Sequence, residues 1–274
     1  MKIKKLCDDA EVILISCAAA EVIVDPLAKW VFKTPQKDND AVIRIFEVMK
    51  KKGISKIAVI ASNTGFGDAG KKQIEELAPK HNLTIVLSET YDKNARDFND
   101  LLNKIKASGA QGIINWSIEP AQSIIPQNMK QLKINIPLFY SHGFGNINYV
   151  KAAEGAAEGI IFPCGRLLVA DLLPDSNKQK KVLLEYKKQY EAQFKEDAST
   201  FGGHAWDALM ILVTAIEKSG SVDKYKIREK IETIKDFVGT GGIFNLSPTD
   251  HNGLQKDAFE MLIVKNDKFT IYKD

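Results

Sequence analysis

The 274-residue sequence is poor in arginine and has no long apolar run, and both scarcities exclude classes of protein. Only four of its 38 basic residues are arginine, and the lysines are scattered along the chain. Nucleic-acid binders instead gather basic side chains on one face, because these side chains replace the counterions of a phosphate backbone. No apolar run reaches the roughly 18 residues that a membrane-spanning helix needs. We therefore expect no nucleic-acid partner and no transmembrane helix.

Cysteine and histidine are also scarce, which argues against metal sites and nucleophilic catalysis. The three cysteines, Cys7, Cys17 and Cys164, form no CxxC pair and have no histidine nearby at ligand spacing. His204 lies one helical turn from Asp207, but no nucleophile motif accompanies this pair, so packing or capping explains it better than base catalysis. We expect no metal, no cofactor and no catalytic residue, and hence a protein that is not an enzyme.

The amino terminus does not match a secretory signal. The basic segment 1–5 resembles the start of one, but Cys7-Asp8-Asp9 interrupts the apolar stretch that should follow. Taken by itself, this start predicts a chain that stays in the cytoplasm.

Apolar and amphipathic runs alternate along the first 162 residues. Strands are predicted at 11–15, 56–61, 83–87, 112–115, 137–140 and 159–162, and helices at 41–52, 68–81, 97–108, after Pro120, and at 147–153. Such alternation predicts an α/β fold with a parallel, doubly wound sheet. Helices at 178–194, 204–219 and 224–234 follow, and strands at 258–264 and 268–272 end the chain.

Four predicted strands end in loops that combine small, hydroxyl-bearing and aromatic residues. These loops are 16–20, 62–66, 115–117 and 141–145. In an open α/β sheet, ligands bind beyond the carboxyl ends of the strands. Together the four loops predict a small-molecule pocket that is mostly apolar with a few polar groups.

A glycine-rich turn beside one of these loops supports a competing hypothesis. Gly65-Phe-Gly-Asp-Ala-Gly70 matches the GxGxxG pattern of dinucleotide sites, and Glu89 follows about 20 residues on. Ser62-Asn-Thr64 lengthen the turn before the first glycine, however, and Asp68 would place a negative charge beside a bound phosphate. The alternative to a solute binder is thus a nucleotide-dependent enzyme that uses the Gly65–Gly70 loop.

The order and spacing of nine segments resemble the type I periplasmic binding proteins, in the branch that serves branched-chain amino acids, amides and aromatic acids. The segments are Leu14–Ala19, Trp30–Pro35, Lys56–Ile60 with Phe66-Gly67, Asp97-Phe98, Lys104–Ser108, Ala156–Gly159, Leu167–Pro174, Gly202–Ala208 and Asp250–Gly253. They extend over nearly the whole chain.

The resemblance implies two Rossmann-like lobes joined by a hinge, the first lobe lacking its N-terminal part. Family members carry further residues before the position of Met1, including an export signal. Residues 1–33 and 165–239 would form the partial first lobe, and residues 34–164 and 240–274 the complete second lobe. The chain would cross between the lobes near Phe32–Pro35, Pro163–Arg166 and Val238–Gly241.

The resemblance also implies a function. Such proteins capture a solute between two closing lobes and deliver it to the membrane permease of an ATP-driven importer, in the periplasm or anchored at the extracellular surface. It places ligand-binding residues at Ser16, Ala18, Ala20 and Phe201 in the first lobe, and at Phe66, Trp116, Ser117 and His142 in the second. A cytoplasmic ligand sensor on the same fold is a further alternative.

Two of these positions differ from the amino-acid binders. Those members carry an acidic residue where this sequence has His142, and they tend to carry a hydroxyl residue where it has Ala20. An imidazole suits a carboxylate or a phenol rather than an ammonium group, because charge-assisted pairing needs opposite sign. With Phe66 and Trp116 against its body, the predicted ligand is a small carboxylate with an aromatic or aliphatic body, and a branched-chain amino acid is the alternative.

Overall fold

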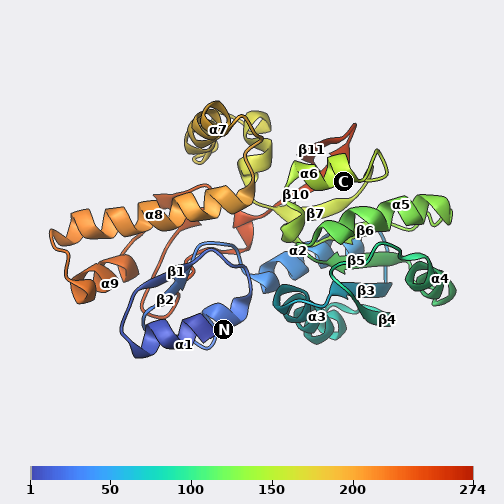
Figure 1. Ribbon diagram of the computed structural model, residues 1–274, viewed down its shortest axis with the longest axis horizontal. Helices are drawn as coiled ribbons and strands as arrows, with labels where there is room; N and C mark the ends of the chain where they lie inside the picture. The colour runs from blue at the N-terminus through green and yellow to red at the C-terminus, as the bar shows by residue number, and fades with distance from the viewer. Residues whose placement is uncertain (1, 274) are drawn as a thin grey trace. The chain divides into compact units, whose positions relative to one another are not determined.

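A computed structural model describes residues 2–273 of the protein, which divides into two compact units (Figure 1). Unit 1 comprises Met1–Lys37 with Gly165–Phe259, and unit 2 comprises Asp38–Cys164 with Glu260–Asp274. The chain therefore passes from one unit to the other three times. Each unit has its own strands, and no sheet among the described residues contains strands of both.

Unit 2 is built on a seven-stranded sheet in the order β11-β10-β7-β6-β5-β3-β4. The strands are β3 (Lys56–Ser62), β4 (Thr84–Tyr91), β5 (Gly112–Trp116), β6 (Leu138–Tyr140), β7 (Ile161–Cys164), β10 (Glu260–Lys265) and β11 (Lys268–Ile271). The strands from β4 to β7 are parallel, and β10 is antiparallel to both β7 and β11. Parallel strands are buried on both faces, which explains the uninterrupted apolar runs in β3 and β5.

Helices alternate with the parallel strands of unit 2, which confirms the predicted α/β class. They are α2 (Asp38–Lys51), α3 (Gly65–Leu77), η2 (Ala78–His81), α4 (Asn99–Ala107), η3 (Pro120–Ser123), α5 (Ile124–Gln131), η4 (His142–Phe144) and α6 (Ile147–Ala152). Helices α2 and α3 pack together, α2 contacting β7 and α3 contacting β3 and β5. Helices α4 and α5 contact each other and lie on the other side of the sheet (Figure 1).

Unit 1 contains two small sheets and several helices. Strands β1 (Leu14–Ser16) and β2 (Val31–Lys33) pair in parallel, and β8 (Phe237–Val238) and β9 (Ile243–Phe244) pair antiparallel. The helices are α1 (Lys2–Asp9), η1 (Glu21–Ile23), η5 (Arg166–Leu172), α7 (Lys180–Phe194), α8 (Thr200–Ser219), α9 (Lys224–Glu232) and η6 (Lys256–Ala258). The sequence pattern does not predict β2, because three residues are too few to show a strand period.

A hydrophobic core joins the two segments of unit 1. Helices α8 and α9 contact each other, and the core joins their apolar residues to β2, β9 and the segment after β9. Its buried members are Phe32, Ile211, Ala215, Ile227, Ile231, Ile234, Phe244, Leu246, Leu254 and Ala258. Each of its isoleucine, leucine and phenylalanine side chains contributes about 1.5–3 kcal/mol when fully buried. Because Phe32 comes from the first segment of unit 1 and the other members from the second, the cluster joins the two segments.

The segment 240–259 lies in unit 1, whereas the resemblance assigns it to the second lobe. Asn252 explains this placement, because its side-chain amide donates to the carbonyl oxygens of Lys33 (3.1 Å) and Pro35 (2.8 Å). The neighbouring His251 ring stacks on Phe32, with centroids 4.1 Å apart. Both contacts tie the segment to β2 and the residues after it.

The chain changes unit at three positions, and the contacts of Asn252 explain the third. The first two changes, after Lys37 and after Cys164, fall at or within a few residues of the predicted crossings. The third falls between Phe259 and Glu260 rather than near Val238–Gly241.

Among the helices that the structure describes, none combines the length and the apolar character needed to cross a bilayer.

Candidate functional site

Three of the predicted ligand-binding residues meet in unit 2. Phe66 lies in the first turn of α3, Trp116 ends β5 and His142 begins η4 after β6. The ring centroids of Phe66 and Trp116 are 5.8 Å apart, and His142 meets both rings at steep angles, at 5.4 Å and 5.6 Å. They converge because parallel neighbouring strands end at the same edge of a sheet.

Trp116 is covered within unit 2 by helix α3. Its side chain has no exposed surface, and a Cβ atom added to Gly70 would lie 2.0 Å from the indole Nε1. Phe66 keeps some exposed surface. Trp116 is thus placed to support Phe66 and His142 from within the unit, while Phe66 offers the accessible apolar ring.

Ser117 is fully buried and serves the turn in which it lies. Its hydroxyl oxygen accepts a hydrogen bond from the Glu119 backbone N–H (2.9 Å), and its carbonyl accepts one from the Ser141 hydroxyl (3.2 Å). A Cβ atom on Gly143 would lie 2.6 Å from that same carbonyl oxygen. Glycine at 143 therefore allows the loops after β5 and β6 to approach closely beside the ring cluster.

Asp38 adds a charge to this cluster that sequence reasoning missed. It is the first residue of α2, and its Oδ1 lies 3.5 Å from His142 Nε2. The exposed fractions of the two side chains are 0% and 6%. A helix N-terminus favours a carboxylate, so an aspartate at the start of α2 suggests only an ordinary first-turn residue. Nothing in the sequence pattern indicates its burial against a histidine.

The glycines of the GxGxxG pattern are explained by packing. A Cβ atom on Gly67 would lie 1.9 Å from the Ser62 carbonyl oxygen, and Gly70 faces Trp116. The Gly67 backbone N–H donates to the Thr64 hydroxyl oxygen (3.1 Å), which caps α3. These contacts account for Gly67 and Gly70 without a phosphate ligand.

Unit 1 holds the other four predicted residues on two separate elements. Ser16 ends β1 and Ala18 and Ala20 lie in the loop that follows, where the Ser16 hydroxyl oxygen accepts from the Ala18 backbone N–H (3.2 Å). Phe201 lies in the first turn of α8 with 41% of its surface exposed. The end of β1 and the loop after it therefore form one local turn, and Phe201 lies on a separate helix.

A buried lysine holds the loop after β1. The Lys33 side chain, only 1% exposed, donates to the carbonyl oxygens of Ala19 and of Gln36, the latter at 3.2 Å. The Thr34 backbone N–H donates to the Ser16 carbonyl (3.1 Å), which fixes the start of the same loop. Sequence reasoning gave Lys33 no role, although a charged residue beside Val31 and Phe32 is the signal that could have found it.

Asp207 anchors a loop of unit 1, and the buried His204 lies one helical turn before it. The Asp207 carboxylate accepts from the backbone N–H groups of Thr240 and Gly241, both at 2.7 Å, and from the Thr240 hydroxyl at 3.1 Å. Burial raises the pKa of Asp207 to about 7, although these donors favour its ionised form. Burial and the charge of Lys33 lower the pKa of His204 to about 4. Both groups therefore favour their neutral forms.

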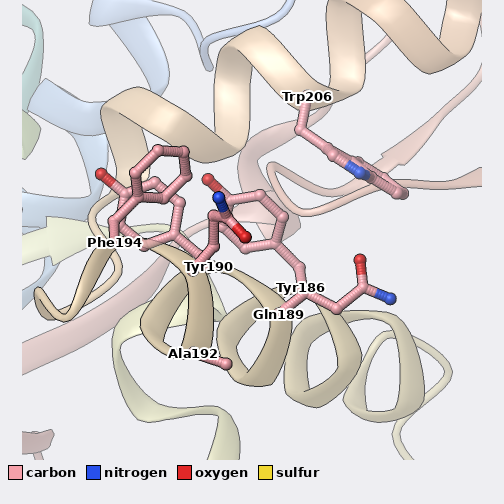
Figure 2. Close-up of a pocket in the computed structure, with 7 residues that line it drawn as sticks. Tyr186, Gln189, Tyr190, Ala192, Phe194 and Trp206 are labelled. Carbon is pink, nitrogen blue, oxygen red and sulfur yellow. The ribbon is translucent and has the colours of Figure 1, made fainter.

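Each unit also has a surface groove away from the predicted residues. Figure 2 shows the groove of unit 1, a cavity of about 520 Å³ lined by Tyr186, Tyr190 and Phe194 of α7 and by Trp206 of α8, whose ring contacts Tyr186. A cavity of about 540 Å³ in unit 2 lies at the amino ends of β6 and β7. Neither lining includes a predicted ligand-binding residue.

Within residues 2–273, no three His, Cys, Asp or Glu side chains are arranged to hold a metal.

Comparison with known structures defines the class of protein. An extracellular ligand-binding receptor from Rhodopseudomonas palustris HaA2 matches with a TM-score of 0.93 at 22% identity, covering 99% of this chain and 78% of the receptor. A leucine binding protein from Thermotoga maritima MSB8 matches with a TM-score of 0.85 at 18% identity, covering 99% of this chain and 75% of that protein. The fold is that of the type I periplasmic binding proteins, as the resemblance implied.

The family follows from the sequence match. Residues 1–267 match the family model described as periplasmic binding protein, so the chain belongs to this family. A curated relative, the leucine-, isoleucine-, valine-, threonine- and alanine-binding protein of Pseudomonas aeruginosa, is 22% identical over 238 residues. That match covers 86% of this chain and 61% of the relative, so the chain spans about three fifths of the relative's length.

Proposed function

We propose that this chain is the solute-binding component of an ATP-driven importer and that it captures a small carboxylate with an aromatic or aliphatic body. Family membership supports a solute-binding role, and the meeting of Phe66, Trp116 and His142 at one sheet edge carries the choice of ligand. A membrane permease is the proposed partner, and the periplasm or the outer cell surface is the proposed location.

The chemistry of the cluster favours an acid. A protonated His142 offers a charge-assisted hydrogen bond to a carboxylate, and the Phe66 ring offers an apolar surface for the ligand's body. An amino acid would also need an anion for its ammonium group. Asp38, the anion in contact with the cluster, has no exposed surface and lies 3.5 Å from the imidazole. Its charge is therefore engaged by His142 rather than offered to a ligand.

Calorimetric titration with benzoate, benzamide and L-leucine tests this proposal. Benzoate is expected to bind more tightly than benzamide, which has the same ring without the charge. His142→Gln should weaken benzoate binding roughly 10- to 100-fold, because a hydrogen bond to a charged group contributes about 1.5–3 kcal/mol. The matched control is His81→Gln, a histidine of unit 2 that packs against Phe46, with centroids 5.4 Å apart.

The amino-acid alternative predicts a different pattern. Tight leucine binding that persists in His142→Gln, together with no heat from benzoate, would show that the ligand assignment is wrong. Equal affinity for benzoate and benzamide would show that charge does not select the ligand.

A further inference from the structure

The His142 ring is fixed on several sides by neighbouring elements of unit 2. Phe66 from α3 and Trp116 from β5 meet it at interplanar angles of 80° and 78°. The Cys164 thiol on β7 lies 3.9 Å from the His142 carbonyl oxygen. The two ring contacts restrict the orientation of the imidazole, and the thiol contact holds the His142 backbone; in that orientation Nε2 faces the Asp38 carboxylate at the start of α2.

An aspartate with no exposed side-chain surface needs compensation for its charge. Burial of a carboxylate is costly unless opposite charge or hydrogen-bond donors stabilise it, and the amino end of α2 supplies part of the opposing potential. A protonated His142 adds an opposite charge at 3.5 Å. In return, an opposite charge at this distance favours the charged form of the imidazole, against the effect of burial.

From this geometry we propose that Asp38 is a positioning residue, which orients His142 and keeps it protonated so that anion capture by unit 2 depends on one proton. The inference rests on the proposed function, because it assumes that His142 contacts the ligand. The groups that neighbouring elements place against His142 include Asp38, which is charged, Cys164, which is titratable, and Phe66 and Trp116, which carry no charge.

The proposed arrangement makes ligand binding and protonation reciprocal. When His142 loses its proton at high pH, the Asp38 carboxylate remains and repels a second anion. Benzoate affinity should therefore fall as the pH rises through the titration of His142. By linkage, saturating benzoate should raise the pH at which His142 titrates. This reciprocity can be measured in the unmodified protein.

The test follows the His142 ring signals by NMR in the ligand-free protein between pH 5 and 9, with His142→Gln identifying them. In Asp38→Asn, the midpoint of the His142 titration should move down by about one pH unit or more, the size of shift typical of a lost ion-pair partner. The pH at which benzoate affinity falls should move down with it. Asp38→Glu, which retains the charge, should keep both midpoints near those of the unmodified protein.

Asp40→Asn is the matched control, because Asp40 lies in the same first turn of α2. It should leave the His142 midpoint unchanged. If the amide at position 38 is not tolerated, Asp38→Ser removes the charge while keeping a side chain suited to a helix start.

The outcomes separate the two proposals. An unchanged His142 midpoint in Asp38→Asn, with benzoate binding still lost in His142→Gln, would overturn the role of Asp38 and leave the proposed function intact. A shifted midpoint with benzoate affinity unchanged in both variants would uphold the pairing and overturn the proposed function.

Discussion

Asp207→Ala is expected to lower the free energy of unfolding of unit 1 by about 4 kcal/mol. The substitution removes the acceptor of the Thr240 and Gly241 backbone N–H groups, and each buried donor left unsatisfied costs about 1–3 kcal/mol. The Thr240 hydroxyl loses a partner as well. Urea unfolding at pH 7 would measure the loss, and amide hydrogen exchange at residues 240 and 241 would localise it.

Glu229→Ala is the matched control for this loss, because Glu229 is an exposed acid on α9 of the same unit. It should change stability by less than about 0.5 kcal/mol, as exposed substitutions usually do. If hydrogen exchange at 240 and 241 in Asp207→Ala matched that of the unmodified protein, the anchoring role of Asp207 would be refuted.

The same pair predicts two opposite pH dependences. His204 titrates at about 4 when folded and near 6.5 when unfolded, so it makes the protein less stable as the pH falls between these values. Asp207 titrates at about 7 when folded and near 3.8 when unfolded, so it makes the protein more stable over the same fall. In the unmodified protein the two effects offset each other between about pH 4 and 6.5.

Single substitutions should reveal the pH dependence of stability that each of the two residues contributes. In Asp207→Asn, where His204 remains, stability should fall by roughly 1 kcal/mol per unit as the pH drops from 6.5 to 4.5. In His204→Asn, where Asp207 remains, it should rise over the same range. Urea unfolding at several pH values measures both slopes as differences from the unmodified protein. Parallel pH curves for all three proteins would contradict the assigned pKa shifts.

The parallel sheet of unit 2 could be predicted from sequence because its signals are local. Strand β3 is the apolar run predicted at 56–61. Helix α3 begins at Gly65, three residues before the predicted start at 68, because Thr64 caps it. The third change of unit could not be predicted, because it depends on Asn252 bonding to the backbone of residues 33 and 35. These groups are more than 200 residues apart in sequence, and no periodicity relates them.

The candidate site was predictable in position but not in exposure. Neighbouring parallel strands end at the same edge of a sheet, so Phe66, Trp116 and His142, each of which follows or ends such a strand, come together there. Strand topology does not indicate that α3 covers Trp116, or that Asp38 is buried against the histidine. Whether a side chain is buried depends on tertiary packing, so only the structure separates the fully buried ring of Trp116 from the partly exposed ring of Phe66.

Gly70→Ala is expected to displace Trp116 and to weaken ligand binding together with stability. An added Cβ would lie 2.0 Å from the indole Nε1, and the indole, with no exposed surface, cannot move without shifting Phe66 and His142. Overpacking of this kind costs about 1–3 kcal/mol and occasionally more. The near-ultraviolet circular dichroism of the tryptophans should change, and calorimetry should show benzoate affinity reduced by about tenfold or more.

The matched control is Gly65→Ala in the same helix, because a Cβ atom there has no neighbour within 4 Å. Alanine is favoured over glycine by about 1 kcal/mol in a helix interior, where Gly70 lies, and by less at the first helical residue, Gly65. A loss in Gly70→Ala therefore comes from the contact with Trp116. Gly65→Ala should therefore keep the tryptophan spectrum and benzoate affinity of the unmodified protein. Equal effects of the two substitutions would mean that α3 does not hold Trp116 in place. A loss of stability in Gly70→Ala with full benzoate affinity would mean that the indole supports the fold of unit 2 but not its ligand site.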